Sequence, residues 1–101
     1  MVIPDGYADH ALQLEVKRGV KDVEVHVVGL SPKAQQVRYS LELRGSSVSR
    51  HRATVSLPGN SRQLLSTMRM SADQPWCVIL TVVEASGRKY DLSEGVCTAV
   101  R

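Results

Sequence analysis

Arg38, Arg44, Arg50 and Arg52 are the residues of this chain with the clearest chemistry of recognition. A guanidinium group is planar and always charged, and its several N–H donors bind carboxylates and amides through more than one contact. Arg38 and Arg44 fall on one face of an alternating strand, and Arg50 and Arg52 on one face of the next. If the two strands pair through the polar turn 45–49, all four arginines gather on one exposed face or edge.

The positive charge of the chain is local. The formal net charge is only +3, too small to indicate a nucleic-acid partner. Residues 37–70, however, contain six arginines against one glutamate, a local charge of +5, while the remainder is slightly acidic. An ordinary solvated face explains such residues equally well. The alternative is a surface that attracts an acidic or amide-rich partner.

Cys77 and Cys97 are too few for a zinc site and lack the spacing of a thioredoxin-like redox pair. Cys77 lies in the apolar run 76–83, which precedes a turn at Gly87 and a second strand that ends at Val100. Folding this hairpin about Gly87 predicts Cys77 opposite Cys97, within reach of a disulfide. A disulfide favours an oxidising compartment such as the periplasm. Two buried thiols in a cytosolic domain are the alternative.

Catalytic chemistry is poorly represented. His10, His26 and His51 are scattered without the spacing of metal ligands, and no nucleophile, zinc-protease or phosphate-loop motif occurs. Asp22 and Glu24 share a strand face, where paired carboxylates can do acid–base work, but on an exposed strand they serve solubility. We therefore predict no catalytic residue, no metal, no cofactor and no enzymatic activity.

The elements that position these residues are strands. Apolar residues recur at every second position, and not at the spacing of a helix. The expected strands are 11–17, 20–28, 37–44, 50–57, 63–70, 76–83 and a last strand ending at Val100. Seven short strands separated by turn signals predict an all-β, immunoglobulin-like, seven-stranded antiparallel β-sandwich. We expect an N-terminal segment, 1–10, and a single sandwich domain, 11–101.

The strand pattern also predicts how the two sheets divide. The first, second and fifth strands are expected to face the third, fourth, sixth and seventh. The fourth strand then lies at an edge, where its charges oppose pairing with other chains. The sixth strand is apolar on both faces and belongs near the sheet centre, so Ile79 or Val83 emerges beside the arginines. In the fifth strand, Leu64, Ser66, Met68 and Met70 are expected on one face.

The order and spacing of elements between Val37 and Val83 resemble the curli assembly inhibitor family, CsgC and CsgH. The similarity covers roughly half to two-thirds of the chain and is closest to the CsgH branch. It is carried by the strand Tyr39–Leu43, the turn Arg44–Ser47, the runs Thr54–Pro58, Leu65–Met70 and Val78–Val82, and the turn Ser86–Gly87. The C-x-C pair of CsgC is absent, so the resemblance does not extend to a thiol-redox role.

The resemblance implies a periplasmic protein that binds the secreted, amyloid-forming curli subunit and prevents premature fibre nucleation. We expect this protein to be a monomer. Arg38, Arg44, Arg50 and Arg52 would contact this client, meaning the amyloid-forming partner, without templating growth. Nucleic-acid binding and membrane insertion are not expected. Two alternatives stay open: an immunoglobulin-like adhesion or accessory module of a surface protein, and a thiol–disulfide redox protein that uses Cys77 and Cys97.

Overall fold

The structure is a computed structural model that describes residues 10–45 and 47–97. It confirms the all-β prediction, because the described residues form seven strands and no helix. The strands are β1 (Leu12–Arg18), β2 (Asp22–Gly29), β3 (Gln35–Arg44), β4 (Val48–Leu57), β5 (Gln63–Ser71), β6 (Cys77–Val83) and β7 (Lys89–Gly95). Val20, predicted to begin the second strand, instead lies in the β1–β2 turn and is almost fully exposed, because the β1–β2 ladder ends at Arg18 and Val23.

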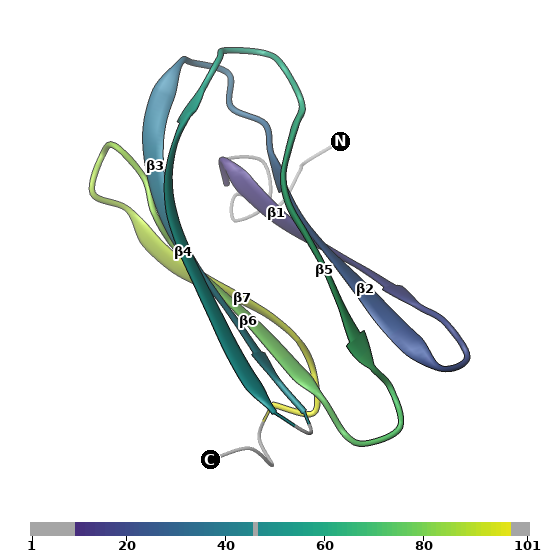
Figure 1. Ribbon diagram of the computed structural model, residues 1–101. Coiled ribbons are helices and arrows are strands. Elements are labelled where there is room, and N and C mark those ends of the chain that lie inside the picture. Colours follow the sequence, from purple (N-terminus) through teal and green to yellow (C-terminus); the bar gives the residue numbers. More distant parts are fainter. Residues whose placement is uncertain (1–9, 46, 98–101) are drawn as a thin grey trace, which may run out of the picture.

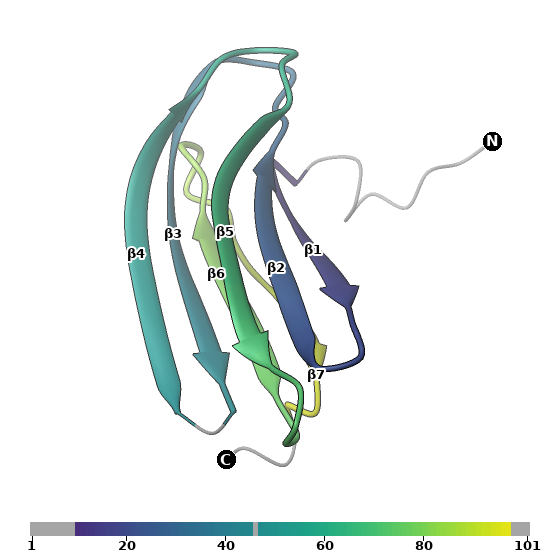
Figure 2. The same ribbon diagram turned by 45° about the vertical axis from the view of Figure 1, so that its right-hand side comes forward.

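The strands form two antiparallel sheets that pack face to face as a β-sandwich (Figures 1 and 2). One sheet has the order β1-β2-β5 and the other β4-β3-β6-β7, which confirms the predicted division and the edge position of β4. In the constant-type immunoglobulin arrangement, the fourth strand joins the sheet of the first, second and fifth. Here β4 pairs with β3, so the four-stranded sheet gains a long edge strand carrying two arginines. The predicted domain boundary at residues 10 and 11 stays a prediction.

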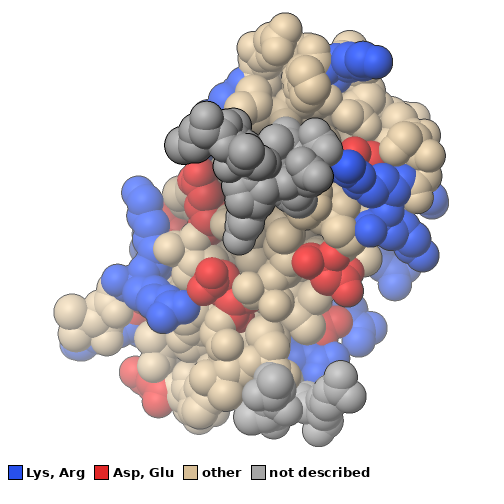
Figure 3. Space-filling model, turned by 180° about the vertical axis from the view of Figure 1, so that it is seen from behind, with Lys and Arg blue, Asp and Glu red and all other residues tan. Residues whose placement is uncertain are grey.

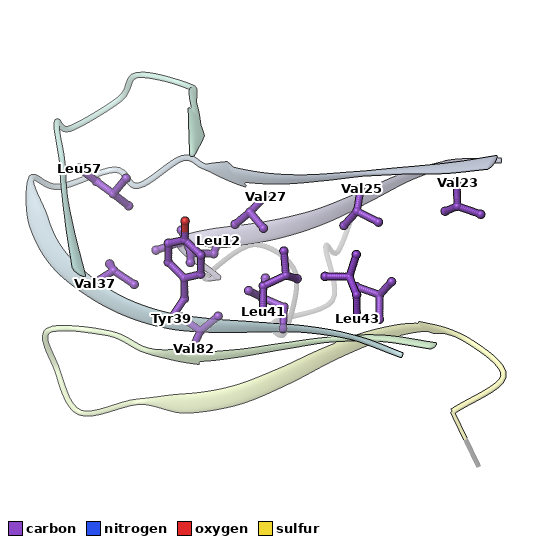
Figure 4. Packing of buried hydrophobic residues seen from close by; sticks show 13 residues of the cluster. Leu12, Val23, Val25, Val27, Val37, Tyr39, Leu41, Leu43, Leu57 and Val82 are labelled. Carbon is purple, nitrogen blue, oxygen red and sulfur yellow. The ribbon is translucent and has the colours of Figure 1, made fainter. Parts of the chain in front are cut away.

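The core lies between the sheets and consists mainly of aliphatic side chains. Alternate residues of β2 point inward, and those of β3 point toward them (Figure 4). Val25, Val27 and Leu41 are fully buried, and the ring of Tyr39 is nearly so. Each such side chain stabilises the fold by about 1.5–3 kcal/mol through loss of apolar surface from water. Because the chain contains no phenylalanine, this packing depends on many valines and leucines.

A β-bulge in β5 overturns one expectation for this strand. Val27 pairs with Ser66 but Val28 pairs with Leu64, so Leu65 is the extra residue. Strict alternation predicts that Leu64 shares the face of Met68 and Met70. Because of the bulge, Leu64 does not share that face. It is 58% exposed, while Leu65 packs against the core.

The β6–β7 hairpin corrects the predicted cysteine register. Cys77 lies opposite Gly95, and β7 ends there, short of the predicted end at Val100. The structure nevertheless contains the Cys77–Cys97 disulfide, with a Cα–Cα distance of 4.9 Å. Gly95 adopts a positive φ of 97°, which turns the chain after the strand, and Val96 N–H then donates to the Trp76 carbonyl at 2.8 Å. The turn brings Cys97 to Cys77 without a direct cross-strand pair. Residues 98–100 lie outside the described residues.

A buried carboxylate fastens the two sheets together along the β1–β7 side. Glu84, only 8% exposed, accepts hydrogen bonds from Ala11 N–H at 2.8 Å and from the Tyr90 hydroxyl at 2.7 Å. The same hydroxyl accepts from Leu12 N–H at 3.2 Å, and the His10 ring stacks on the Tyr90 ring at 3.8 Å. The first residues of one sheet are thus bonded to the β6–β7 hairpin of the other. Burial raises the pKa of the Tyr90 phenol, because it penalises the charged form.

Candidate functional site

The outer face of the four-stranded sheet brings all four predicted arginines together. In the β3–β4 register, Glu42 lies opposite Arg50 and Arg38 lies opposite Thr54. Residues in register share a face of the sheet, so Arg38, Arg44, Arg50 and Arg52 project to the same side, away from the core. Val83 pairs with Arg38 and lies on this face too, as predicted.

Glu42 divides the four arginines into two classes. Its carboxylate accepts hydrogen bonds from Nε of Arg44 and from Nε of Arg50, the latter at 3.0 Å. The Arg44 hydrogen bond, followed by that of Arg50, lowers the pKa of Glu42, because both interactions favour the ionised carboxylate. Arg44 and Arg50 are therefore partly neutralised by a neighbour on their own sheet.

Arg38 and Arg52 border a shallow hollow of about 900 Å³ on this face. Lys89, at the start of β7, completes its basic rim. Within residues 10–45 and 47–97, none of these three cations forms an ion pair. The hollow spans all four strands and is lined by Arg38, Tyr39, Ser40, Arg52, Ala53, Thr54, Thr81, Val83 and Lys89.

The lining supports binding by hydrogen bonds and charge. Three cations supply N–H donors, and the hydroxyls of Ser40, Thr54 and Thr81 both donate and accept. Val83 adds an apolar contact. Carboxylate and side-chain amide groups match these donors, and the open shape admits an extended chain more readily than a compact small molecule. Within the part of the chain that the structure describes, no group of three or more His, Cys, Asp or Glu residues could hold a metal ion.

Sequence reasoning did not find the contributions of Thr81 and Lys89. Thr81 interrupts an apolar run, and its place between Leu80 and Val82, both buried, is a signal that it faces outward. Lys89 carries no such signal, because its place on the rim depends on the β6–β7 register, which pairs it with Val83. Strand pairing therefore decides which basic residue completes the hollow.

Two arginines of the basic stretch belong to the other half of the sandwich, namely Arg69 in β5 and Arg62 just before this strand. Arg62 binds Glu15 at 3.0 Å, and Arg69 lies 3.7 Å from Asp22. Figure 3 shows basic side chains gathered along both flanks of the molecule, with carboxylates between them. The local charge of residues 37–70 is thus divided between two faces, and of its six arginines only Arg38 and Arg52 form no ion pair with the described residues.

The chain matches no known protein-family model and no curated protein sequence. Its fold, however, is shared with solved structures. The E. coli curli protein CsgC matches with a TM-score of 0.60 and 16% identity, over 81% of this chain and 94% of that one. R. palustris CsgH matches with a TM-score of 0.56 and 11% identity, over 83% and 89%.

A third structure shows that this sandwich also occurs within larger proteins. Parabacteroides merdae β-glucuronidase matches with a TM-score of 0.51 and 14% identity, over 86% of this chain but only 13% of the enzyme. CsgC and CsgH, in contrast, correspond to this chain over most of their own length. The resemblance to CsgC and CsgH is thereby confirmed as a shared fold. Residues 10–45 and 47–97 contain no helix that is long and apolar enough to cross a membrane.

Proposed function

We propose that this protein is a periplasmic, chaperone-like inhibitor of curli amyloid formation that binds the secreted curli subunit and prevents premature fibre nucleation. The shared fold with CsgC and CsgH supports a curli-related role. One observation supports the binding mechanism most directly, namely the hollow whose cations Arg38, Arg52 and Lys89 have no ion-pair partners among the described residues. The protein acts by binding and not by catalysis, and it works as a monomer.

The chemistry of the hollow suits a strand-forming client. An extended segment presents alternate side chains to one side, so its carboxylates and amides can reach Arg38 and Arg52 together. Hydroxyls on the floor can bind amides that reach deeper. These contacts use side chains on a sheet face and leave the backbone of the client unpaired, so binding does not extend a β-ladder.

Arg38 and Arg52 are proposed as the principal client contacts, and Arg44 and Arg50 as secondary ones. The side chain of Arg50 is 60% exposed, but part of its charge is already satisfied by Glu42. A client carboxylate must compete with Glu42 for Arg44 and Arg50. At Arg38 and Arg52 it displaces only water.

The Cys77–Cys97 disulfide supports the periplasmic location and a structural role for the cysteines. Cys77 is fully buried. Reactive cysteines of redox enzymes are partly exposed, so Cys77 does not fit the role of an attacked or attacking cysteine. The bond is expected to persist in an oxidising compartment.

Fibre-growth kinetics test the proposal. Purified curli subunit is followed by thioflavin fluorescence with substoichiometric amounts of the wild type, the double variant R38Q/R52Q and the matched control R44Q/R50Q. Both variants lose two charges from the same sheet face. R38Q/R52Q should shorten the lag time toward that of the subunit alone, while R44Q/R50Q should keep most of the delay. Equal lag times for the two variants would refute the assignment, and no delay by the wild type would refute the function.

A further inference from the structure

Strand β5 differs from the other three edge strands of the sandwich. The edges β1 and β7 are tied to each other, since Arg18 binds Glu94 at 2.8 Å. Edge β4 carries Arg50 and Arg52, which oppose strand addition. Strand β5 has one charged residue, Arg69, and its guanidinium lies near the carboxylates of β2. The outer edge of β5 therefore has the least protection by charge.

The backbone at this edge is regular over six residues. Ser66–Ser71 pairs without interruption with Asp22–Val27, and the bulge at Leu65 ends the regular stretch. In an antiparallel ladder, alternate residues direct both their N–H and C=O groups to the same neighbour. Half of these residues thus face β2, and the other half face away from it. The outward groups have no hydrogen-bond partner among the described residues.

A narrow cleft lies beside this edge, between the two sheets. Its volume is about 150 Å³, and its walls include Leu43 and Ser49 from one sheet and Met68 and Met70 from the other. Methionine side chains are flexible and adapt to differently shaped apolar groups. Alternate side chains of a strand added to β5 would point toward this cleft.

The charge around the cleft restricts which segment can bind there. No aspartate or glutamate occurs between Glu42 and Asp73, whereas five arginines do. Among the described residues that line the cleft, Arg69 is the one charged side chain, and no carboxylate lines it. A basic segment is repelled, and an uncharged or acidic one is complementary.

We propose that the outer edge of Ser66–Ser71 binds an extended peptide segment, uncharged or acidic, by β-strand addition, with alternate side chains entering the methionine-lined cleft. This binding mode combines main-chain hydrogen bonds with pockets for alternate side chains. The site is separate from the hollow around Arg38 and Arg52. Only the identity of the natural partner of this site depends on the proposed function.

Amide hydrogen exchange measured by NMR tests the site directly. The probe is a capped peptide of about eight residues, alternating threonine and glutamine, with two further versions that carry one aspartate or one lysine. In the free protein, alternate amides within 66–71 should exchange fast, and the neutral and aspartate peptides should slow those same amides. The lysine peptide should bind more weakly. Protection confined to residues of the hollow, or no binding at millimolar peptide, overturns the proposal.

Edge variants provide the matched test. Thr67→Lys places a charge on the exposed side of β5, and Ser93→Lys makes the same change on the opposite edge strand, β7. T67K should weaken peptide binding about tenfold or more, and S93K should leave it unchanged. Equal affinities, or a β5-mediated dimer that the peptide does not disrupt, would overturn the site. Since the readout is peptide binding, failure here is distinct from failure of R38Q/R52Q to change fibre lag times.

Discussion

Replacing Tyr90 by phenylalanine removes one hydroxyl that serves both sheets. In the wild type this hydroxyl donates to Glu84 at 2.7 Å and accepts from Leu12 N–H at 3.2 Å. The variant keeps the ring, so its stacking on His10 can persist. Glu84 then has one fewer donor for a carboxylate that is 8% exposed, and Leu12 loses an acceptor.

The loss in stability should be about 2 kcal/mol. A hydrogen bond to a charged group contributes about 1.5–3 kcal/mol, and a neutral one about 1 kcal/mol. We choose a value in the lower part of the range for a charged partner, because Tyr90 is only partly buried. In a domain of this size, about 2 kcal/mol lowers the melting temperature by about 10 °C. Tyr39→Phe is the matched control, because its hydroxyl bonds only to the neutral Ser66, at 2.6 Å, and should cost about 1 kcal/mol.

Urea unfolding at several pH values supplies a second readout. Burial raises the pKa of Tyr90 in the folded state. The Tyr90 hydroxyl therefore makes its full contribution to the free energy of unfolding below the ordinary phenol pKa of about 10, and this contribution is lost as the pH rises through the folded-state pKa. The wild type should therefore lose more stability than Y90F above pH 10. Equal unfolding free energies for the wild type and Y90F at neutral pH, or identical alkaline slopes, would refute the role given to this hydroxyl.

Three further predictions concern the turn glycines, the disulfide and Glu42. Gly95→Ala should destabilise by more than about 2 kcal/mol in urea unfolding, for two reasons. A Cβ at this position would clash with Trp76, and the φ of 97° is strained for alanine. Gly87→Ala has a similar φ but open space, so a loss above about 1–2 kcal/mol would contradict this reasoning. Reducing Cys77–Cys97, whose sequence separation is 20, should cost about 3 kcal/mol, measured with and without dithiothreitol; an unchanged midpoint would contradict this value. Glu42→Gln should remove a stabilising contribution that is present above pH 4.5 and lost as the pH falls through the lowered pKa. An equal loss of stability in E42Q and the wild type as the pH falls would argue against this contribution.

Much of the fold follows from local pattern. Period-2 alternation in β3 places Val37, Tyr39 and Leu41 inward, because successive side chains of a strand face opposite sides. The doubly apolar β6 belongs inside its sheet for the same reason. Turn residues mark the ends of strands, so the number and order of strands were predictable.

Register was harder to predict, because it depends on contacts between strands. Symmetric folding about Gly87 paired Cys77 with Cys97, whereas the hairpin pairs Cys77 with Gly95. The disulfide forms all the same, because the turn at Gly95 returns the chain. In β5, the bulge at Leu65 reversed the face expected for Leu64, and nothing in the local alternation marks an extra residue.

The same distinction applies to the candidate site. The sequence by itself determined that Arg38, Arg44, Arg50 and Arg52 share a face, because their positions within two alternating strands require it. Only the tertiary structure decided that Glu42 binds two of them and that Lys89 joins the other two around a hollow. Charge pairing across strands depends on distances of a few ångströms, and the order and register of strands set those distances.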